Sequence, residues 1–379
     1  MRTKSLCLLC CAVFVVLTGI PALAHFDHHH QQQAIIPNLP ATPTHSITTV
    51  PPNGDVNPYG VAFVPWGFPS GGPLQPGDIL VSNFNNFNNL QGTGTTIVHI
   101  DPATSTQSLF FQGQTGLGLT TALGILKRGF VLVGNVPSTN GLGVCTQSGD
   151  LEQGVEQGSL IILDKNGNLV KTLSNAEFLD GPWDLTINDE GDFAQLFISN
   201  VLSGTVVRLE LSINENDILD PVIVLSTTQI ASGYLHQCNS AAFVVGPTGL
   251  AYDNDRDILY VASTGDNAIF AIRDARRTRK DNGMGKIVVN DAVHLHGPLG
   301  LVLAPNGDLI TSQGDAVNED TTHPSEIVEF TPWGKFVAQI SIDPAIGGAF
   351  GIALHSFGDG FTFAAVDDNT SVLDVWVVK

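Results

Sequence analysis

The stretch GPTGLAYD, residues 246–253, decides the fold because the chain writes it repeatedly. In GPTGLAY, strand alternation places Gly249 and Ala251 on one face, opposite Leu250. One face of the strand is then almost free of side chains, which suits close approach of a neighbouring sheet. The related stretches are NPYGVAF at 57–63, GPWDLTI at 181–187, GPLGLVL at 297–303 and GAFGIAL at 348–354.

Each of these stretches opens a longer repeat of short strands. GPTGLAYD is followed by DILYVAS at 257–263, NAIFAIR at 267–273 and KIVVN at 286–290. About six such four-stranded units, at intervals of about 50 to 65 residues, are typical of a β-propeller. The pattern predicts an all-β, six-bladed β-propeller with four-stranded antiparallel blades.

The last repeat contains only three strands before the chain stops at Lys379. A three-stranded sheet would leave an unpaired edge and an open ring. We therefore predict that HSITTV, residues 45–50, pairs outside 371–378, so that an N-terminal strand completes the last blade.

The N-terminus has the pattern of a secretory signal peptide. Basic Arg2 and Lys4 precede an apolar stretch that ends in the small-residue sequence ALA. We assign 1–24 to a cleaved signal peptide, 25–44 to a flexible leader rich in His, Gln and Pro, and 45–379 to the propeller. The protein is then secreted or periplasmic with no membrane span after cleavage, the alternative being an uncleaved anchor.

The charge of the chain limits its partners. The formal net charge is −20, and it becomes −22 when Arg2 and Lys4 leave with the signal peptide. Because contacts between basic residues and phosphates supply the affinity for nucleic acids, we expect no nucleic-acid binding. We expect a monomer whose partner is a small polar ligand or another protein.

Two cysteines, Cys145 and Cys238, remain after cleavage of the signal peptide. In an oxidising compartment we predict that they form one disulfide, the alternative being two separate thiols. On the chain-entropy model such a bridge stabilises the fold by about 4 to 5 kcal/mol.

The repeat follows the pattern GPxGLxxxxNGDLhVS and then a short xxIhxhD strand, where h is a hydrophobic residue and x is any residue. This pattern resembles the NHL-repeat and gluconolactonase-like superfamily of six-bladed propellers. The resemblance covers about 54–379 and is clearest in the first, fourth and fifth repeats. It implies the fold, but the superfamily includes calcium- or zinc-dependent lactonases, zinc-dependent lyases and non-enzymatic binders, so it does not select a function. The whole chain also resembles a group of secreted bacterial propeller proteins.

Polar residues end the second strands of the repeats. In a propeller these ends lie on the same side as the starts of the first strands, a side that we call the top. A ring of amides and a carboxylate there could hold calcium or bind a polar ligand, or the residues could merely start turns. The residues are Asn83, Asn135, Asn200, Gln313 and Asp367.

Asp184 departs from the repeat, because the other clear copies have Gly at its position. It places a carboxylate beside the propeller axis, where a buried charge needs water, a cation or a hydrogen-bond donor. The pattern favours hydrogen bonds from Asp184 to neighbouring loop backbone, and the alternative is a role in binding a ligand or a metal, for which Asp184 is a candidate ligand-binding residue.

Histidines of the second half are candidate metal ligands. In HLHGP the two rings of an extended segment would point the same way, and Asp315 or Glu326 could complete a zinc-type site. The alternative is that they are turn or core histidines. The candidates are His236, His294, His296 and His323. The leader would begin at His25 with HFDHHH, which in principle binds copper or nickel.

Two functions follow from these patterns. The first is a propeller that binds a small polar ligand or a partner protein at the top of its central channel. The alternative is a lyase or lactonase that uses a divalent metal, calcium or zinc, at the same place. The sequence has no G-x-S-x-G, no HExxH and no phosphate-binding glycine loop, so no catalytic residue is assigned.

The signal-peptide and disulfide predictions have a common test. The intact mass of the exported protein is expected to match a chain that begins at His25 and lacks two hydrogen atoms. Reduction should restore those two atoms. A mass that includes residues 1–24, or that reduction leaves unchanged, would contradict the respective prediction.

Overall fold

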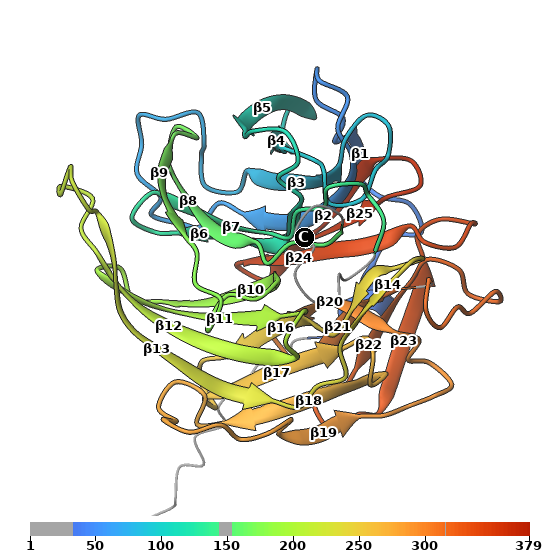
Figure 1. Ribbon diagram of the computed structural model, residues 1–379. Coiled ribbons are helices and arrows are strands. Elements are labelled where there is room, and N and C mark those ends of the chain that lie inside the picture. Colours follow the sequence, from blue (N-terminus) through green and yellow to red (C-terminus); the bar gives the residue numbers. More distant parts are fainter. Residues whose placement is uncertain (1–32, 144–153, 315) are drawn as a thin grey trace, which may run out of the picture. The chain divides into compact units, whose positions relative to one another are not determined.

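The computed structural model describes residues 33–143, 154–314 and 316–379 (Figure 1). This part of the chain folds into six four-stranded antiparallel sheets, the blades, which lie around a common axis. A two-stranded hairpin and the short 3-10 helix η1 (Ile36–Asn38) complete the structure described. None of its helical segments is long and apolar enough to cross a membrane.

The blades follow one another along the chain, and each runs from its innermost strand outwards. Blade 1 contains β2 (Val56–Phe63), β3 (Ile79–Asn85), β4 (Thr96–Asp101) and β5 (Thr106–Gln112), and blade 2 contains β6 (Leu119–Leu126), β7 (Phe130–Asn135), β8 (Ser159–Asp164) and β9 (Leu169–Leu173). Blade 3 contains β10 (Pro182–Asp189), β11 (Phe193–Asn200), β12 (Thr205–Ile213) and β13 (Val222–Ser232), and blade 4 contains β16 (Pro247–Asp253), β17 (Ile258–Ser263), β18 (Ala268–Arg273) and β19 (Lys286–Val289). Blade 5 contains β20 (Pro298–Leu303), β21 (Leu309–Gln313), β22 (Glu326–Phe330) and β23 (Phe336–Ser341), and blade 6 contains β24 (Ala349–Phe357), β25 (Gly360–Asp367), β26 (Val372–Val378) and β1 (His45–Thr48). The hairpin β14 (Gln237–Asn239) and β15 (Phe243–Val245) lies between blades 3 and 4 in the chain.

The ring closes as the sequence predicts. The six innermost strands contact one another in cyclic order, and β24 of blade 6 contacts β2 of blade 1. The N-terminal strand β1 pairs antiparallel with β26, with His45 opposite Val375 and Thr48 opposite Val372. The fourth strand of the last blade therefore comes from the start of the propeller, which ties both ends of the chain together.

Glycine in the repeated stretch permits the inner strands to approach. A Cβ atom on Gly249 would lie 2.3 Å from the carbonyl oxygen of Leu299 in the next blade, and one on Gly351 would lie 1.7 Å from that of Tyr59. Both distances are far inside van der Waals contact. The prediction that one face is kept free for the neighbouring blade is confirmed at these junctions.

Hydroxyl groups on the first and second strands connect successive blades. Serine or threonine side chains near the axis donate to backbone carbonyls of the following blade, which satisfies buried polar groups that have no ladder partner. The bonds run from Ser82 to Thr120, from Thr120 to Pro182, from Ser199 to Thr248, from Thr248 to Pro298 and from Ser312 to Phe350.

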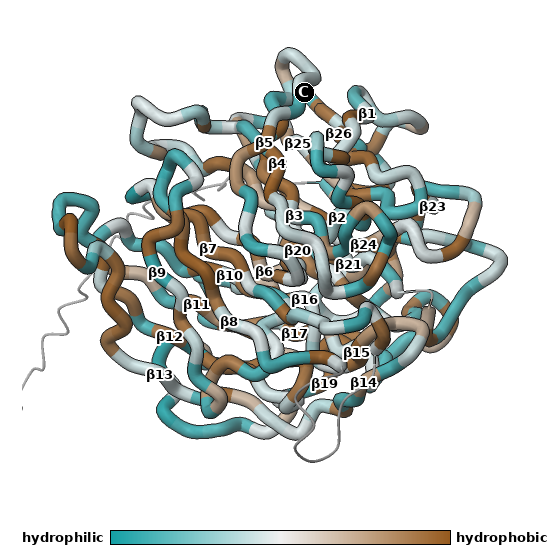
Figure 2. Tube along the Cα trace, turned by 45° about the horizontal axis from the view of Figure 1, so that its top comes forward, coloured by the Kyte–Doolittle hydropathy of each residue, from teal (hydrophilic) through white to brown (hydrophobic). Residues whose placement is uncertain are grey.

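The hydrophobic core is divided among the six interfaces between blades. Leu80 and Leu123 belong to the cluster between blades 1 and 2, and Ile47 and Val61 belong to the cluster that joins blade 6 to blade 1. Each of the other four junctions has its own cluster. Figure 2 shows the hydrophobic segments along the strands and the hydrophilic ones mainly in the turns.

The leader differs in part from the sequence expectation of a flexible segment over 25–44. Residues 25–32 lie outside the described chain, but Ile35 and Ile36 are buried against blades 5 and 6. Their backbone N–H groups donate to the carboxylate of Glu329 at 2.9 and 2.7 Å. A buried acceptor far away in sequence and two apolar side chains hold this segment in place.

Replacing Gly351 by alanine should weaken the closure of the ring. The added methyl group would overlap the backbone carbonyl oxygen of Tyr59, so we expect the free energy of unfolding to fall by about 3 kcal/mol. Gly116→Ala is the matched control, because its φ of +77° disfavours alanine by about 1 kcal/mol although nothing lies within 4 Å. Urea unfolding measures the free energy of unfolding of both variants. An equal decrease in the two would contradict a steric requirement for glycine at position 351.

Candidate functional site: the central channel

The innermost strands of all six blades line a cavity of about 610 Å³ along the axis. Most of the lining side chains are apolar, among them Val61, Leu123, Leu250, Leu301 and Ile352, while polar atoms contribute a comparable part of the exposed wall. Because every inner strand contributes, the cavity is the central channel of the propeller. A concave, largely apolar pocket with few polar groups is the usual form of a small-molecule site.

An aromatic cluster fills the top end of this channel. Tyr59 stacks between Phe84 and Phe350, with ring centroids 4.6 Å apart in both pairs. Trp183 packs edge-on against Tyr59 at 5.8 Å, and Phe243 from the β14–β15 hairpin packs against Phe84 at 5.2 Å. All but Phe350 are buried, so the cluster closes the mouth at which the sequence predicts a ligand.

The other end of the channel, the bottom, carries the open mouth. Its lining includes Trp66, of which 64% is exposed, and Lys127, whose ammonium group donates to the backbone carbonyl of Asp189 at 3.0 Å. His355 stacks on Phe63 and lies tilted against Trp66, with centroids 5.3 and 5.9 Å away. Burial lowers the pKa of His355, which favours the neutral imidazole.

Asp184 supplies the acidic group inside the channel. Its carboxylate accepts hydrogen bonds from the backbone N–H of Leu250 in blade 4 and from that of Leu185, both at 2.8 Å. Burial raises the pKa of Asp184 well above its ordinary value, although these two donors oppose the shift. The side chain of Asp184 thus bridges the junction between blades 3 and 4 and also lines the cavity. At the junction of blades 4 and 5, the corresponding residue is Gly249, which lets the backbones of the two blades come close.

The five polar residues at the ends of the second strands have a different environment. All are buried, and each bonds to groups at the top of its own blade or of the adjacent loop. Asn135, for example, accepts from Ser159, and Gln313 bonds to backbone atoms of His294 and His296. None of Asn83, Asn135, Asn200, Gln313 and Asp367 is among the residues that line the cavity.

Asn83 is the exception among these five in its hydrogen bonding. Its amide group donates to Thr49 and Thr96, but its amide oxygen is buried without a partner among the described residues. Asn57 and Asn85 of the same blade share this feature. Asp368, whose charge acts on Tyr59 of the aromatic cluster, is also perturbed. Burial and then Asp367 raise the pKa of Asp368 to about 7.

The four candidate histidines do not converge on one metal site, because each has a separate hydrogen-bond partner. His236 bonds to the backbone carbonyl of Tyr234, and His294 lies in a turn, where it pairs with Asp291 at 2.7 Å and stacks on Phe336. The HLHGP segment is therefore not extended before β20, and its two rings have separate partners. Asp315 lies outside the described residues.

His296 and His323 each pair with a carboxylate on the rim of blade 5. His296 bonds to Glu326 at 2.9 Å, and His323 bonds to Asp320 at 2.8 Å. The sequence marks Glu326 as a candidate but not Asp320, because nothing in DTTHPSE shows that this loop folds back towards His296.

Cys238 lies in β14 of the hairpin that covers the top, and Cys145 lies outside the described residues. The predicted bridge therefore stays a prediction. Gly143, two residues before Cys145, packs against the backbone of Asn239 and Phe243, so the chain approaches the hairpin that carries Cys238.

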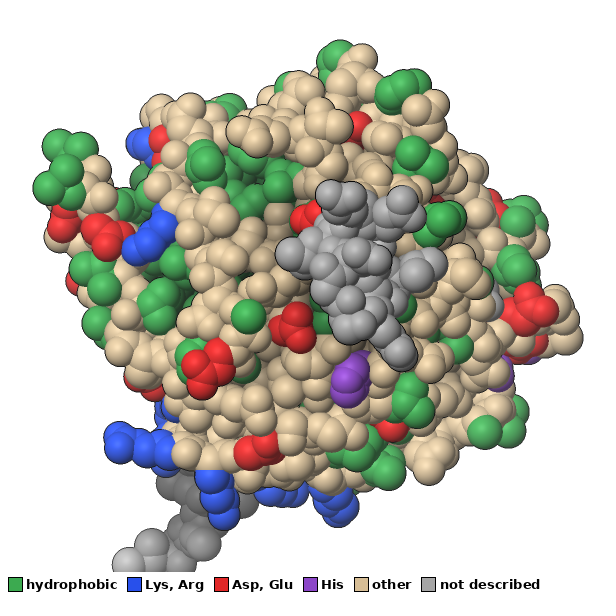
Figure 3. Space-filling model, in the orientation of Figure 1, with side chains coloured by type: hydrophobic (Ala, Val, Ile, Leu, Met, Phe, Trp, Pro, Cys, Tyr) green, Lys and Arg blue, Asp and Glu red, His purple; other side chains and the backbone are tan. Residues whose placement is uncertain are grey.

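Charge on the surface follows the composition of the chain. Figure 3 shows acidic side chains scattered over the face in view and Lys and Arg mostly along its lower edge, with a few at the left. Most of the basic side chains of the run 271–280 are exposed, and they continue to Lys286 in β19.

Solved structures support the fold. A gluconolactonase of Xanthomonas campestris is 12% identical, with a TM-score of 0.53 over 90% of this chain and 97% of that one. A chain of the mitotic checkpoint complex is 11% identical, with a TM-score of 0.52 over 98% and 99% of the two chains. An α-L-arabinofuranosidase of Fusarium graminearum is 14% identical, with a TM-score of 0.51 over 88% and 98%.

No family model and no curated protein matches the chain. The structural likenesses are to proteins of unlike activity, and at these identities they show the fold alone. The class of protein is therefore a six-bladed β-propeller, as the repeat pattern predicts.

The raised pKa of Asp184 predicts a pH-dependent stability. Because the folded pKa lies above the unfolded value of about 4, the stability present at low pH should fall as the pH rises from there towards the folded pKa, by at most about 1.4 kcal/mol per pH unit. Asp184→Asn should remove this component. Chemical unfolding of both proteins between pH 4 and neutrality measures it, and parallel curves would contradict it.

Proposed function

We propose that the protein binds a small molecule in its central channel and admits it through the bottom mouth. The observation that carries this proposal is the cavity of about 610 Å³, closed at the top by aromatic side chains and lined by all six inner strands. Its volume is within the range of about 300 to 1,000 Å³ that is usual for small-molecule sites.

The lining suggests the chemistry of the ligand. An apolar or aromatic body fits the wall of Leu123, Leu250 and Leu301, and the rings at the mouth can stack on it. Asp184 offers one hydrogen-bonding group at depth, and Lys127 offers a positive charge at the entrance. A compact aromatic or aliphatic compound with an anionic or polar end meets these features.

A ligand in this cavity enters from the bottom of the channel, whereas the sequence pattern favours the top. The polar strand ends do lie at the top, but Tyr59, Trp183 and Phe243 occupy that space. The metal-dependent lyase or lactonase is the second candidate. Among the described residues, the one group of three potential metal ligands lies on the rim of blade 5 and does not line the cavity, so binding is favoured over that chemistry.

Secretion is part of the same proposal. The signal-peptide pattern at residues 1–24 supports export. The acidic composition of the chain suits a protein that stays in solution and keeps apart from nucleic acids and anionic membranes.

Anilinonaphthalene sulfonate is a suitable probe, since it combines aromatic rings with an anionic group. Leu303→Trp places a bulky ring in the lining near the bottom mouth, so we expect the affinity for the dye to fall at least about tenfold. Fluorescence titration of the dye measures the effect.

Leu225→Trp is the matched control, because Leu225 is 56% exposed on β13 at the outer edge of blade 3. It should leave the affinity unchanged. Equal dye binding by wild type and both variants would place the dye elsewhere and contradict a ligand site in the channel.

A further inference from the structure

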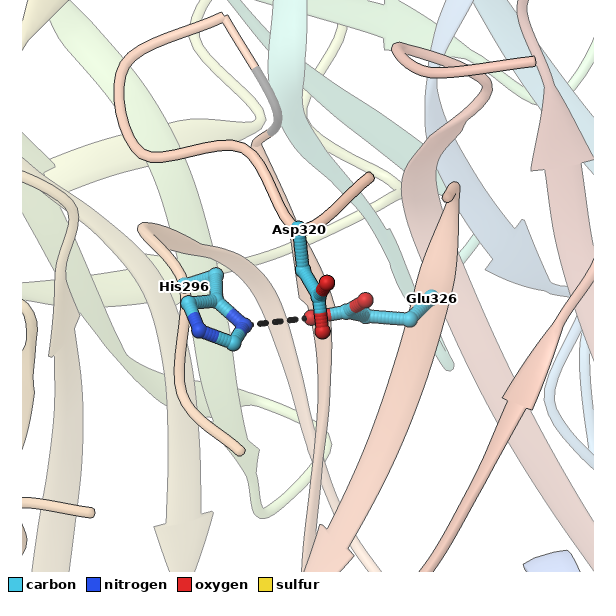
Figure 4. Close-up of side chains that lie close together, drawn as sticks. All are labelled: His296, Asp320 and Glu326. Atoms are coloured by element: carbon cyan, nitrogen blue, oxygen red, sulfur yellow. Dashed lines mark hydrogen bonds and ion pairs between the residues drawn. The ribbon is translucent and has the colours of Figure 1, made fainter. Parts of the chain in front are cut away.

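Three metal-ligating side chains meet on the top rim of blade 5. His296 comes from the loop before β20, Asp320 from the loop after β21, and Glu326 from the first position of β22. One ligand atom from each lies within 4.8 Å of the other two. Figure 4 shows the imidazole of His296 and the two carboxylates pointing towards one another.

The backbone around the cluster is held in place before any ligand arrives. Gln313 accepts from the N–H of His296 at 3.1 Å and donates to the carbonyl of His294 at 2.7 Å. Asn267 of blade 4 accepts from the N–H of Gly297 at 2.6 Å. Glu326 lies in a sheet strand opposite Ser341, so blades 4 and 5 together fix the positions of the donors.

The spacing of the donor atoms fits one ion. Nδ1 of His296 and Oε1 of Glu326 are 2.9 Å apart. Two ligands at about 2.1 Å from a tetrahedral zinc ion lie about 3.4 Å apart. When an ion replaces the proton between these two atoms, they separate by about 0.5 Å, and Asp320, whose ligand atom lies within 4.8 Å of both, moves in from the loop as the third ligand.

The charge and donor types of the cluster favour a divalent transition ion. Two carboxylates stand together here, and Glu326 has a side chain only 1% exposed. An imidazole nitrogen is a poor ligand for calcium and magnesium but a good one for zinc. We propose that His296, Asp320 and Glu326 form a zinc site on the rim of blade 5, separate from the channel.

The remaining contacts assign supporting roles around this site. His323 bonds to the carboxylate of Asp320 at 2.8 Å, and Thr322 donates to the same carboxylate through its backbone N–H and its hydroxyl. Such outer contacts orient a ligating carboxylate. Zinc would thus fasten the loop that carries Asp320 to the sheet strand that carries Glu326, closing the long top loop of blade 5.

The test uses the full mature chain, purified without an affinity tag. The leader histidines His25, His28, His29 and His30 are replaced by glutamine in every sample, because they bind metals independently. Isothermal titration with Zn²⁺ should then show one site, and His296→Asn and Glu326→Gln should each weaken it at least about tenfold. Thermal unfolding without metal shows whether each variant is folded.

His236→Asn is the matched control, since His236 bonds to backbone outside the cluster, and it should bind Zn²⁺ like the parent. Hydrogen exchange of 316–325 should slow when zinc is added to the parent. The proposal is overturned if the parent binds no zinc at millimolar concentration, if His296→Asn keeps full affinity, or if calcium binds in place of zinc. Dye binding in the channel is a separate measurement, so either proposal can fail alone.

Discussion

The fold depends on how closely six strands can approach one axis. At the junction of blades 6 and 1, the backbone of Tyr59 occupies the space in which a side chain on Gly351 would stand. Serine and threonine hydroxyls then satisfy carbonyls that no ladder reaches, as from Ser82 to Thr120. Backbone contact at the axis and apolar clusters between the blades are thus two results of the same alternation, small residues on one face and large ones on the other.

Blade 3 departs from this rule, and this departure places an acidic side chain in the lining of the channel. Asp184 replaces a glycine, and its carboxylate reaches the N–H of Leu250 in the next blade. The junction is bridged by a side chain in place of direct backbone contact. An acidic group is thereby held among the apolar side chains of the channel, where burial raises the pKa of Asp184 and the N–H groups of Leu250 and Leu185 oppose that shift.

The sequence predicts most of the architecture because the decisive interactions repeat locally. The four-stranded units and the pairing of β1 with β26 follow from the repeat and from one missing strand. The aromatic roof could not be predicted in the same way. Phe243 comes from an insertion outside the repeat, and Phe84 follows Asn83 without any local sign that it would turn towards the axis. The contact of Glu329 with Ile36 joins positions far apart in the chain, and local patterns carry no information about such pairs.

The loops at the two ends of the propeller differ in how they contact the channel. At the top, the β14–β15 hairpin packs over the channel through Phe243, and the loop that carries Asp320 lies on the rim of blade 5. The buried polar strand ends bond to other protein groups: Asn135 bonds to Ser159 at the start of β8, and Gln313 bonds to the backbone of the segment before β20. At the bottom most turns are short, but the loop 64–78 is long, and its Trp66 and the Lys127 side chain line the open mouth of the cavity. Long loops are commonly where a ligand binds, but they occur here at both ends, so loop length alone does not locate the open mouth.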